Sequence, residues 1–146
     1  MAVKIRIKKI SRKEFEKKYG KYPSAMVGKS NGYDVELKKG YSKSSTKKVL
    51  QHEMGHIFYE TRKLGKKIPP YAKRKLREGM TKERIKDYKK RGAKSGKAIM
   101  QEGLADVYYY IRYGSPHEKR LFKESHPGVY KVIKQQIKKF KPKIVK

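Results

Sequence analysis

The feature that most constrains this fold is a change in the spacing of apolar residues near residue 40. The segment VKIRIKKI (3–10) alternates apolar and charged residues, which is the pattern of a strand with one buried face. The segment 24–39 predicts two more short strands around a Ser-Asn-Gly turn at 30–32. Beyond that segment the apolar residues recur at helical spacing. This order predicts an α+β domain, with a small N-terminal sheet before a helical C-terminal half.

Capping residues set the bounds of the expected helices. Ser11 and Glu14 predict a short helix over 11–20, between the strands. The sequence SPHE (115–118) combines a serine cap, a proline and a glutamate in the order that begins a helix. The helical half is expected to contain helices over 46–64, 71–78, from 81 onward, 97–113, 116–124 and 126–140.

The charge of the chain is strongly unbalanced, because 42 Lys and Arg stand against 13 Asp and Glu, for a net charge of +29. Such a charge attracts nucleic acid, anionic membrane surfaces and acidic proteins. A lysine-rich thermophile surface is the plainer alternative, but those surfaces balance lysine with glutamate and this one does not. Basic residues are densest over 62–94 and 131–146, where we expect a nucleic acid or another polyanion to bind.

Residues 1–146 contain no internal repeat or linker, so we expect one monomeric domain with a loose basic tail at 141–146. The chain has no cysteine, which excludes disulfides and thiolate metal sites. The N-terminus lacks the apolar run of a signal peptide, and no stretch approaches the ~20 apolar residues of a membrane span. We therefore expect the protein in the cytoplasm, or in a virus particle assembled there.

The segment VLQHEMGHIFYE (49–60) carries the first candidate site. His52 and His56 are four residues apart, so on a helix they share one face and can bind one ion. Neutral imidazoles suit zinc, and Glu53 beside them can act as the general base for water. The alternative is a surface helix that carries two solvated histidines.

A hydrolytic zinc site needs a third protein ligand, and no third histidine follows soon after His56. The apolar segment AIMQEGLADVYYYI (98–111) offers Glu102 and Asp106, four residues apart. Burying two carboxylates on an apolar helix is costly unless they are paired or bind a metal. Glu102 is then the expected third ligand, and Asp106 can accept the free N–H of a ligating histidine. The alternative is a pair of solvated carboxylates on the outer face.

The two motifs HEMGH and EGLAD resemble those of the gluzincin metallopeptidases, most closely the anthrax lethal factor-like peptidase domain. The resemblance extends over about residues 25–140. It implies a zincin-like fold and a zinc-dependent endopeptidase with one Zn²⁺ ion, which hydrolyses peptide bonds through Glu-assisted attack of a zinc-bound water. By position it implies three zinc ligands, which are His52, His56 and Glu102. It also implies that Glu53 is the general base and that Asp106 supports a ligating histidine.

One position departs from this family. The lethal factor-like domains carry a tyrosine before the glutamate ligand, thought to stabilise the oxyanion, and Ser95 stands at that place here. A serine is too short for the same role. We therefore consider four other side chains as candidates for it, namely Tyr88, Tyr108, His117 and His126.

A second hypothesis is a nucleic-acid-binding or virion-associated basic protein on a zincin scaffold, with a structural or vestigial zinc ion. The charge supports it, but structural zinc sites usually fill all four positions with protein ligands, and cysteine is preferred. A third hypothesis combines both, with a peptidase that meets its substrates on DNA or in a virion. For a peptidase we expect an extended, acidic polypeptide to bind as an added strand along DVELKK (34–39), at a sheet edge.

Overall fold

The alternating segment at the N-terminus forms β1 (Val3–Ile10) in the computed structural model, which describes residues 2–145. The two short strands expected after it are β2 (Ala25–Lys29) and β3 (Tyr33–Lys38). They pair antiparallel around the predicted turn, where Asn31 and Gly32 both adopt positive φ angles, of 49° and 108°. Asparagine and glycine tolerate this conformation best, which explains the Ser-Asn-Gly sequence at the turn.

The expectation of a loose tail at 141–146 is wrong for the part that the structure describes. Pro142–Val145 form β4, which lies parallel to β1, and the N–H of Val3 donates to the carbonyl of Lys141 at 2.8 Å. Lys146 lies outside the described residues. The local pattern is too short to predict this strand, because its partner lies at the other end of the sequence.

The sheet is mixed and has the order β2-β3-β1-β4, with β1 parallel to β3 and β4. The DVELKK segment belongs to β3 and lies between two strands, so the expectation that it forms a sheet edge is wrong. The edges are β2 and β4. Sequence periodicity shows which residues form a strand but not which strands flank it, and this explains the error.

The helices follow their capping residues, with small shifts in their bounds. Ser11 caps α1 (Arg12–Tyr19), Ser42 caps α2 (Lys43–Thr61), and Ser115 with Glu118 completes a capping box on α7 (Pro116–Ser125). The helix expected over 46–64 ends early, because Lys63 takes a left-handed conformation before the short α3. The remaining helices are α3 (Leu64–Lys67), α4 (Pro70–Glu78), α5 (Lys82–Lys90), α6 (Gly96–Tyr113) and α8 (Pro127–Ile137).

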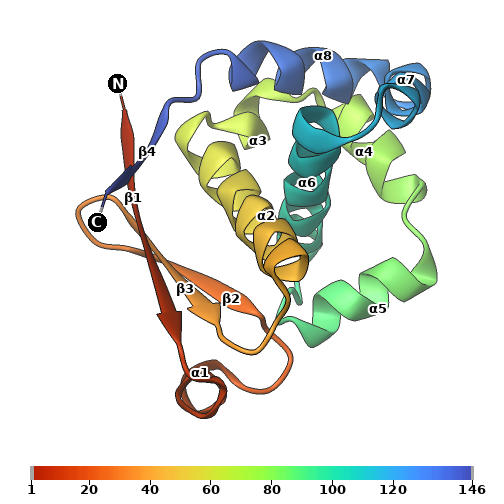
Figure 1. The fold of residues 1–146 in the computed structure, drawn as a ribbon. Helices are drawn as coiled ribbons and strands as arrows, with labels where there is room; N and C mark the ends of the chain where they lie inside the picture. The colour runs from red at the N-terminus through yellow and green to blue at the C-terminus, as the bar shows by residue number, and fades with distance from the viewer. Residues whose placement is uncertain (1, 146) are drawn as a thin grey trace.

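The architecture is α+β, with the small sheet and α1 on one side and helices α2 to α8 on the other (Figure 1). Helices α2 and α6 lie side by side in the centre, and α8 crosses one end of both. The core joins these parts: the ring of Phe58 on α2 lies 5.0 Å from that of Tyr108 on α6 and 5.2 Å from that of Phe140. The sheet packs against α2 through β2 and β3, and α2 in turn packs against α6.

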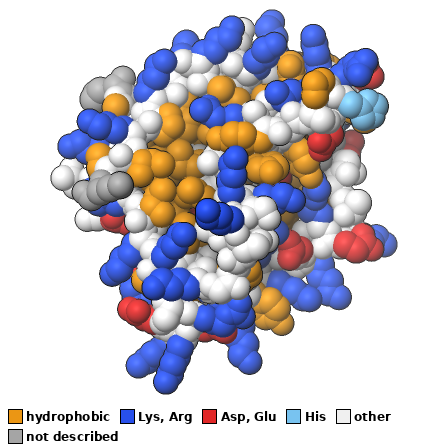
Figure 2. Space-filling model, viewed as in Figure 1, with side chains coloured by type: hydrophobic (Ala, Val, Ile, Leu, Met, Phe, Trp, Pro, Cys, Tyr) orange, Lys and Arg blue, Asp and Glu red, His pale blue; other side chains and the backbone are white. Residues whose placement is uncertain are grey.

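The surface differs sharply from this core. Figure 2 shows Lys and Arg side chains around most of the outline, and a patch of hydrophobic side chains in the region between β1 and α2. Within residues 2–145, no helix has both the length and the apolar character needed to cross a membrane.

Candidate metal centre

Helices α2 and α6 bring three possible ligand atoms to one point. The Nε2 atoms of His52 and His56 lie 3.1 Å apart. The Oε2 atom of Glu102 lies 3.5 Å from Nε2 of His52 and contacts Nε2 of His56. Ligands bound tetrahedrally to zinc lie about 3.3 Å from one another, because each is about 2.0 Å from the ion. Two of the three separations, 3.1 Å and 3.5 Å, are therefore close to those of zinc ligands, and the third pair, Glu102 and His56, lies closer together than in a zinc site.

The helix spacing makes this convergence possible. A Cβ atom at Gly55 would lie only 2.8 Å from Cα and O of Ala105, so the two helices touch there through their backbones. Gly55 lies between the two histidines on α2, and Ala105 lies between the two carboxylates on α6. The absence of a side chain at Gly55 thus lets the carboxylates reach the histidines.

Asp106 occupies the far side of His52. Its Oδ1 atom lies 2.8 Å from Nδ1 of His52, and its Oδ2 atom accepts a hydrogen bond from the hydroxyl of Tyr88. With the proton of the neutral ring on Nδ1, the Nε2 atom of His52 keeps a free lone pair toward His56 and Glu102. Asp106 and Tyr88 therefore hold the ring in the orientation and tautomer that a metal ligand needs.

The charges of the site strongly favour a positive species between the carboxylates. Burial lowers the pKa of His52, but hydrogen bonds and charges from Asp106 and Glu102 outweigh it and raise the pKa to about 10. Burial raises the pKa of Glu102, yet its contacts with His52 and His56 prevail and keep that pKa below its ordinary value. Such a site attracts a proton when no other cation is bound, and by the same charges it attracts a divalent metal ion.

Glu53 lies beside the ligands without the same close contacts. One ligand atom each from His52, Glu53 and His56 lies within 4.8 Å of the others, so by distance alone Glu53 could also be a ligand. Glu102 is closer to both histidines, which favours Glu102 for that role. Burial raises the pKa of Glu53 above its ordinary value, and the neighbouring histidines only partly offset this. A carboxylate with a raised pKa is a better proton acceptor, as a general base requires.

A cavity of about 880 Å³ opens over these residues. Its walls are β2 with the residues before it (22–27), α2, the C-terminal end of α5 and the N-terminal half of α6. Arg91, which follows α5, also lines the cavity, and its Nη1 atom lies 3.8 Å from Oε1 of Glu102. Sequence reasoning missed Arg91, since no pattern separates it from the other Lys and Arg residues nearby.

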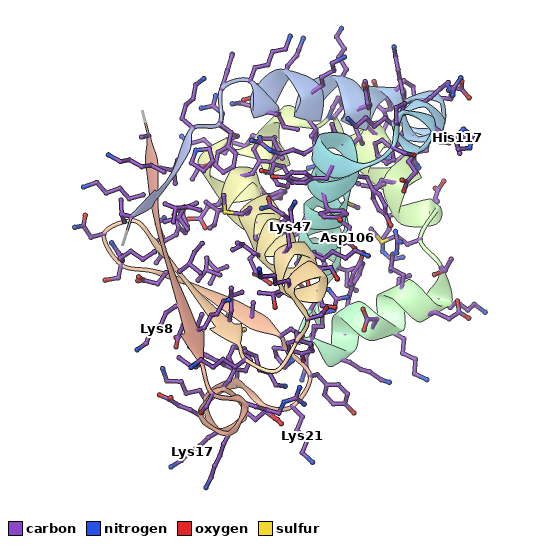
Figure 3. The ribbon with its side chains drawn as sticks, in the orientation of Figure 1. Lys8, Lys17, Lys21, Lys47, Asp106 and His117 are labelled. Carbon is purple, nitrogen blue, oxygen red and sulfur yellow. The ribbon has the colours of Figure 1, made fainter. Side chains whose placement is uncertain are left out.

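The candidates for the missing tyrosine lie in different places. Tyr88 is buried and donates to Asp106, so its hydroxyl is already engaged. Tyr108 is buried in the core, His126 lies between α7 and α8, and Figure 3 shows His117 at the outer part of α7, apart from Asp106. These three do not line the cavity within residues 2–145. Ser95 has a local role, because its hydroxyl accepts the N–H of Ala98 at 3.0 Å and caps α6.

We compared the chain with protein-family models, with curated proteins and with solved structures, and found no match in any of the three. Arguments about its function therefore rest on the geometry and charges of its own residues.

Proposed function

We propose that this protein is a zinc-dependent endopeptidase with a zincin-like fold. The observation that carries the proposal is the convergence of two imidazole nitrogens and one carboxylate oxygen from two separate helices. Nε2 of His52 lies 3.1 Å from Nε2 of His56 and 3.5 Å from Oε2 of Glu102, and Oε2 of Glu102 also contacts Nε2 of His56. Asp106 behind His52 and Glu53 beside the ligands supply the other two groups that a hydrolytic site needs. The cavity gives a polypeptide access to all of them.

In this proposal His52, His56 and Glu102 would hold the ion, which would supply Lewis-acid chemistry for the scissile carbonyl and the attacking water. Glu53 accepts the proton of that water as the water attacks the carbonyl carbon. Glu53 then gives the proton to the nitrogen of the leaving amine, which completes the hydrolysis and restores its carboxylate. Asp106 keeps the N–H of His52 in place throughout, and Tyr88 keeps Asp106 in place.

Arg91 is our candidate for stabilising the oxyanion. It is a permanently charged side chain, it lines the cavity, and it lies on the Glu102 side of the site. Asp87 accepts one of its hydrogen bonds and holds the guanidinium in position. A cation fixed at the edge of a partly buried site stabilises negative charge that develops on the carbonyl oxygen.

The substrate is expected to lie along β2. This strand borders the cavity, and its outer side pairs with no other strand within residues 2–145. An extended polypeptide can add to such an edge through backbone hydrogen bonds, which suits cleavage with little dependence on sequence. The net charge of +29 draws acidic polypeptides toward the protein from a distance.

The test is to measure bound zinc and cleavage of unfolded casein for the wild type, Glu53→Gln and Glu60→Gln. Glu60 is the matched control, because it lies on the same helix, lines the same cavity and forms an ion pair with Lys29 at 2.7 Å. We expect one zinc ion in each protein, cleavage by the wild type and Glu60→Gln, and a loss of at least about 100-fold in Glu53→Gln. If all three proteins bind zinc and none cleaves casein, the zinc ion is structural or vestigial, and the proposal of peptidase activity is refuted.

A further inference from the structure

The two most basic segments of the chain meet at the C-terminal ends of α2, α3 and α8. Nε of Arg62 donates to Oε1 of Gln136 at 2.9 Å, and Nζ of Lys67 donates to the same oxygen at 3.1 Å. Gln136 is 8% exposed, so its position is fixed by packing on α8. The side-chain amide of Gln136, from the segment 131–146, therefore holds Arg62 and Lys67, from the segment 62–94, side by side.

Two further cations belong to this group. Desolvation lowers the pKa of Lys67, and the positive charges of Arg62, Lys139 and Lys63 lower it further, which indicates that each of these three lies near Lys67. None of the four forms an ion pair with a carboxylate within residues 2–145. We call Arg62, Lys63, Lys67 and Lys139, together with Gln136, the Gln136 cluster.

The geometry of the cluster leaves its donors available. Arg62 uses only Nε toward Gln136, and its two Nη groups donate to no residue between 2 and 145. These Nη groups form the outer edge of the guanidinium, with the spacing that binds two oxygens of a phosphate. A single amide oxygen uses few of the hydrogen bonds that the four cations can donate.

Helix ends explain part of this arrangement but not all of it. Helices α2, α3 and α8 end at Thr61, Lys67 and Ile137, and the partial negative charge of each C-terminal end favours a nearby cation. One cation at each end would provide that effect. Placing Arg62 and Lys67 on the same oxygen brings like charges together, which costs free energy unless an anion completes the site.

We propose that the Gln136 cluster binds the phosphate groups of a nucleic acid backbone. A polyanion offers several phosphates to a surface of high positive charge and releases its counterions on binding. A membrane site would add exposed apolar side chains to the cations, and Figure 2 shows such side chains between β1 and α2. The helices that carry or precede the cluster, α2, α3 and α8, have no large exposed apolar residue, which favours the nucleic acid. The proposal does not depend on peptidase activity, because none of the cluster residues lines the cavity.

The sharpest test compares Gln136→Glu with Gln135→Glu in binding to a short DNA duplex over a series of salt concentrations. Both variants add one negative charge to α8, but Gln135 is exposed and only Gln136 contacts Arg62 and Lys67. We expect Gln136→Glu to pair with both cations, to weaken DNA binding about tenfold and to reduce the slope of log K against log salt by about 1. Gln135→Glu should stay within about twofold of the wild type.

A second pair of variants guards against effects on folding. The double variant Arg62→Gln/Lys67→Gln removes two positive charges from the cluster. Its control, Lys17→Gln/Lys21→Gln, removes two positive charges from the far end of the molecule, where both side chains are exposed (Figure 3). Thermal melts should show folded protein in every case. The first pair should weaken DNA binding by more than the second.

Three outcomes would overturn the proposal. The first is equal loss of DNA binding in the cluster variants and their controls, which indicates diffuse attraction alone. The second is a wild type that does not bind the duplex even at low salt. The third is a loss that appears with vesicles of phosphatidylserine and phosphatidylcholine but not with DNA, which would assign the cluster to a membrane surface.

Discussion

The cavity and the Gln136 cluster have opposite charge compositions, although α2 contributes to both. Within residues 2–145, five of the chain's 13 side-chain carboxylates line the cavity, and the only Lys and Arg side chains that do so are Lys48 and Arg91. The Gln136 cluster contains four cations and no carboxylate. In a chain with so few acids, this distribution concentrates negative charge at the site proposed for a metal ion and leaves the cluster without counter-charges. The difference indicates two sites with ligands of opposite sign.

The largest expected effect concerns the cation within the cavity. If the carboxylate-rich cavity catalyses hydrolysis, Arg91→Gln should lower kcat for casein about 100-fold, because it removes charge stabilisation of the oxyanion. KM and bound zinc should change little. Lys48→Gln is the control, since Lys48 also lines the cavity, and it should change kcat far less. An unchanged kcat in Arg91→Gln would remove Arg91 from the mechanism.

The next effect concerns the carboxylate behind the metal ligands. Asp106→Asn keeps the shape of the side chain but removes the charge that His52 contacts at 2.8 Å. We expect zinc affinity to fall by about 10- to 100-fold, as measured by competition with a chelating dye. Asp87→Asn removes a carboxylate from the same cavity wall and should leave the zinc affinity unchanged. Equal losses in the two variants would mean that the general charge of the cavity, and not the contact with His52, holds the ion.

A smaller effect tests whether the crossing of α2 and α6 creates the acidic site. Gly55→Ala places a methyl group 2.8 Å from the backbone of Ala105 and should lower the free energy of unfolding by about 1–3 kcal/mol. Zinc affinity should fall as well, because the carboxylates of α6 move away from the histidines. Gly96→Ala, at the start of α6, meets no atom within 4 Å and should stabilise the protein by about 0.4–1 kcal/mol. Denaturant titrations of both variants measure the difference.

A further effect is a dependence of stability on pH that the histidine of the cavity should produce. In the zinc-free protein the pKa of His52 is raised from 6.5 to about 10, so its contribution is complete below pH 6.5 and is lost between pH 6.5 and about 10. The pKa values of Glu102 and Asp106 are lowered from 4.5 and 3.8, so their contributions are lost only as the pH falls below these values. Denaturant titrations of zinc-free protein should therefore show declining stability above pH 6.5.

Saturating zinc should abolish that decline, because the ion replaces the proton on His52. Asp106→Asn should reduce it in the zinc-free protein, since Asp106 raises the pKa of His52. A decline that persists unchanged with zinc, or in Asp106→Asn, would show that other groups cause it.

The local patterns in the sequence were sufficient to predict most elements and the approach of four site residues. Strands β1 to β3 have strict alternation or a turn signal, and all helices except α3 and α8 start at serine, threonine or proline caps. His52 and His56, like Glu102 and Asp106, are four residues apart on long helices, so each pair shares one face. Their proximity is now observed, while their role as zinc ligands stays a prediction.

Other features could not be predicted because they depend on residues far apart in the sequence. The pairing of β4 with β1 joins the two ends of the described chain, and its four residues carry no strong pattern of their own. The strand order that makes β2 the edge depends on how the whole sheet assembles. Arg91 and the Gln136 cluster lie within highly basic segments, where composition shows the charge but not which cations face a cavity or one another.

The open edge of β2 has a consequence for the behaviour of the protein in solution. Within residues 2–145 the outer side of β2 pairs with no strand, so it can accept an extended chain, including the β2 of a second copy, and edges of this kind commonly lead to aggregation. Each copy carries a net charge of +29, so two copies repel one another before their edges can meet, whereas an acidic polypeptide is attracted. The surplus of lysine and arginine thereby opposes the association of two copies through this edge, and concentrated salt, which screens that repulsion, is the condition under which copies would begin to associate.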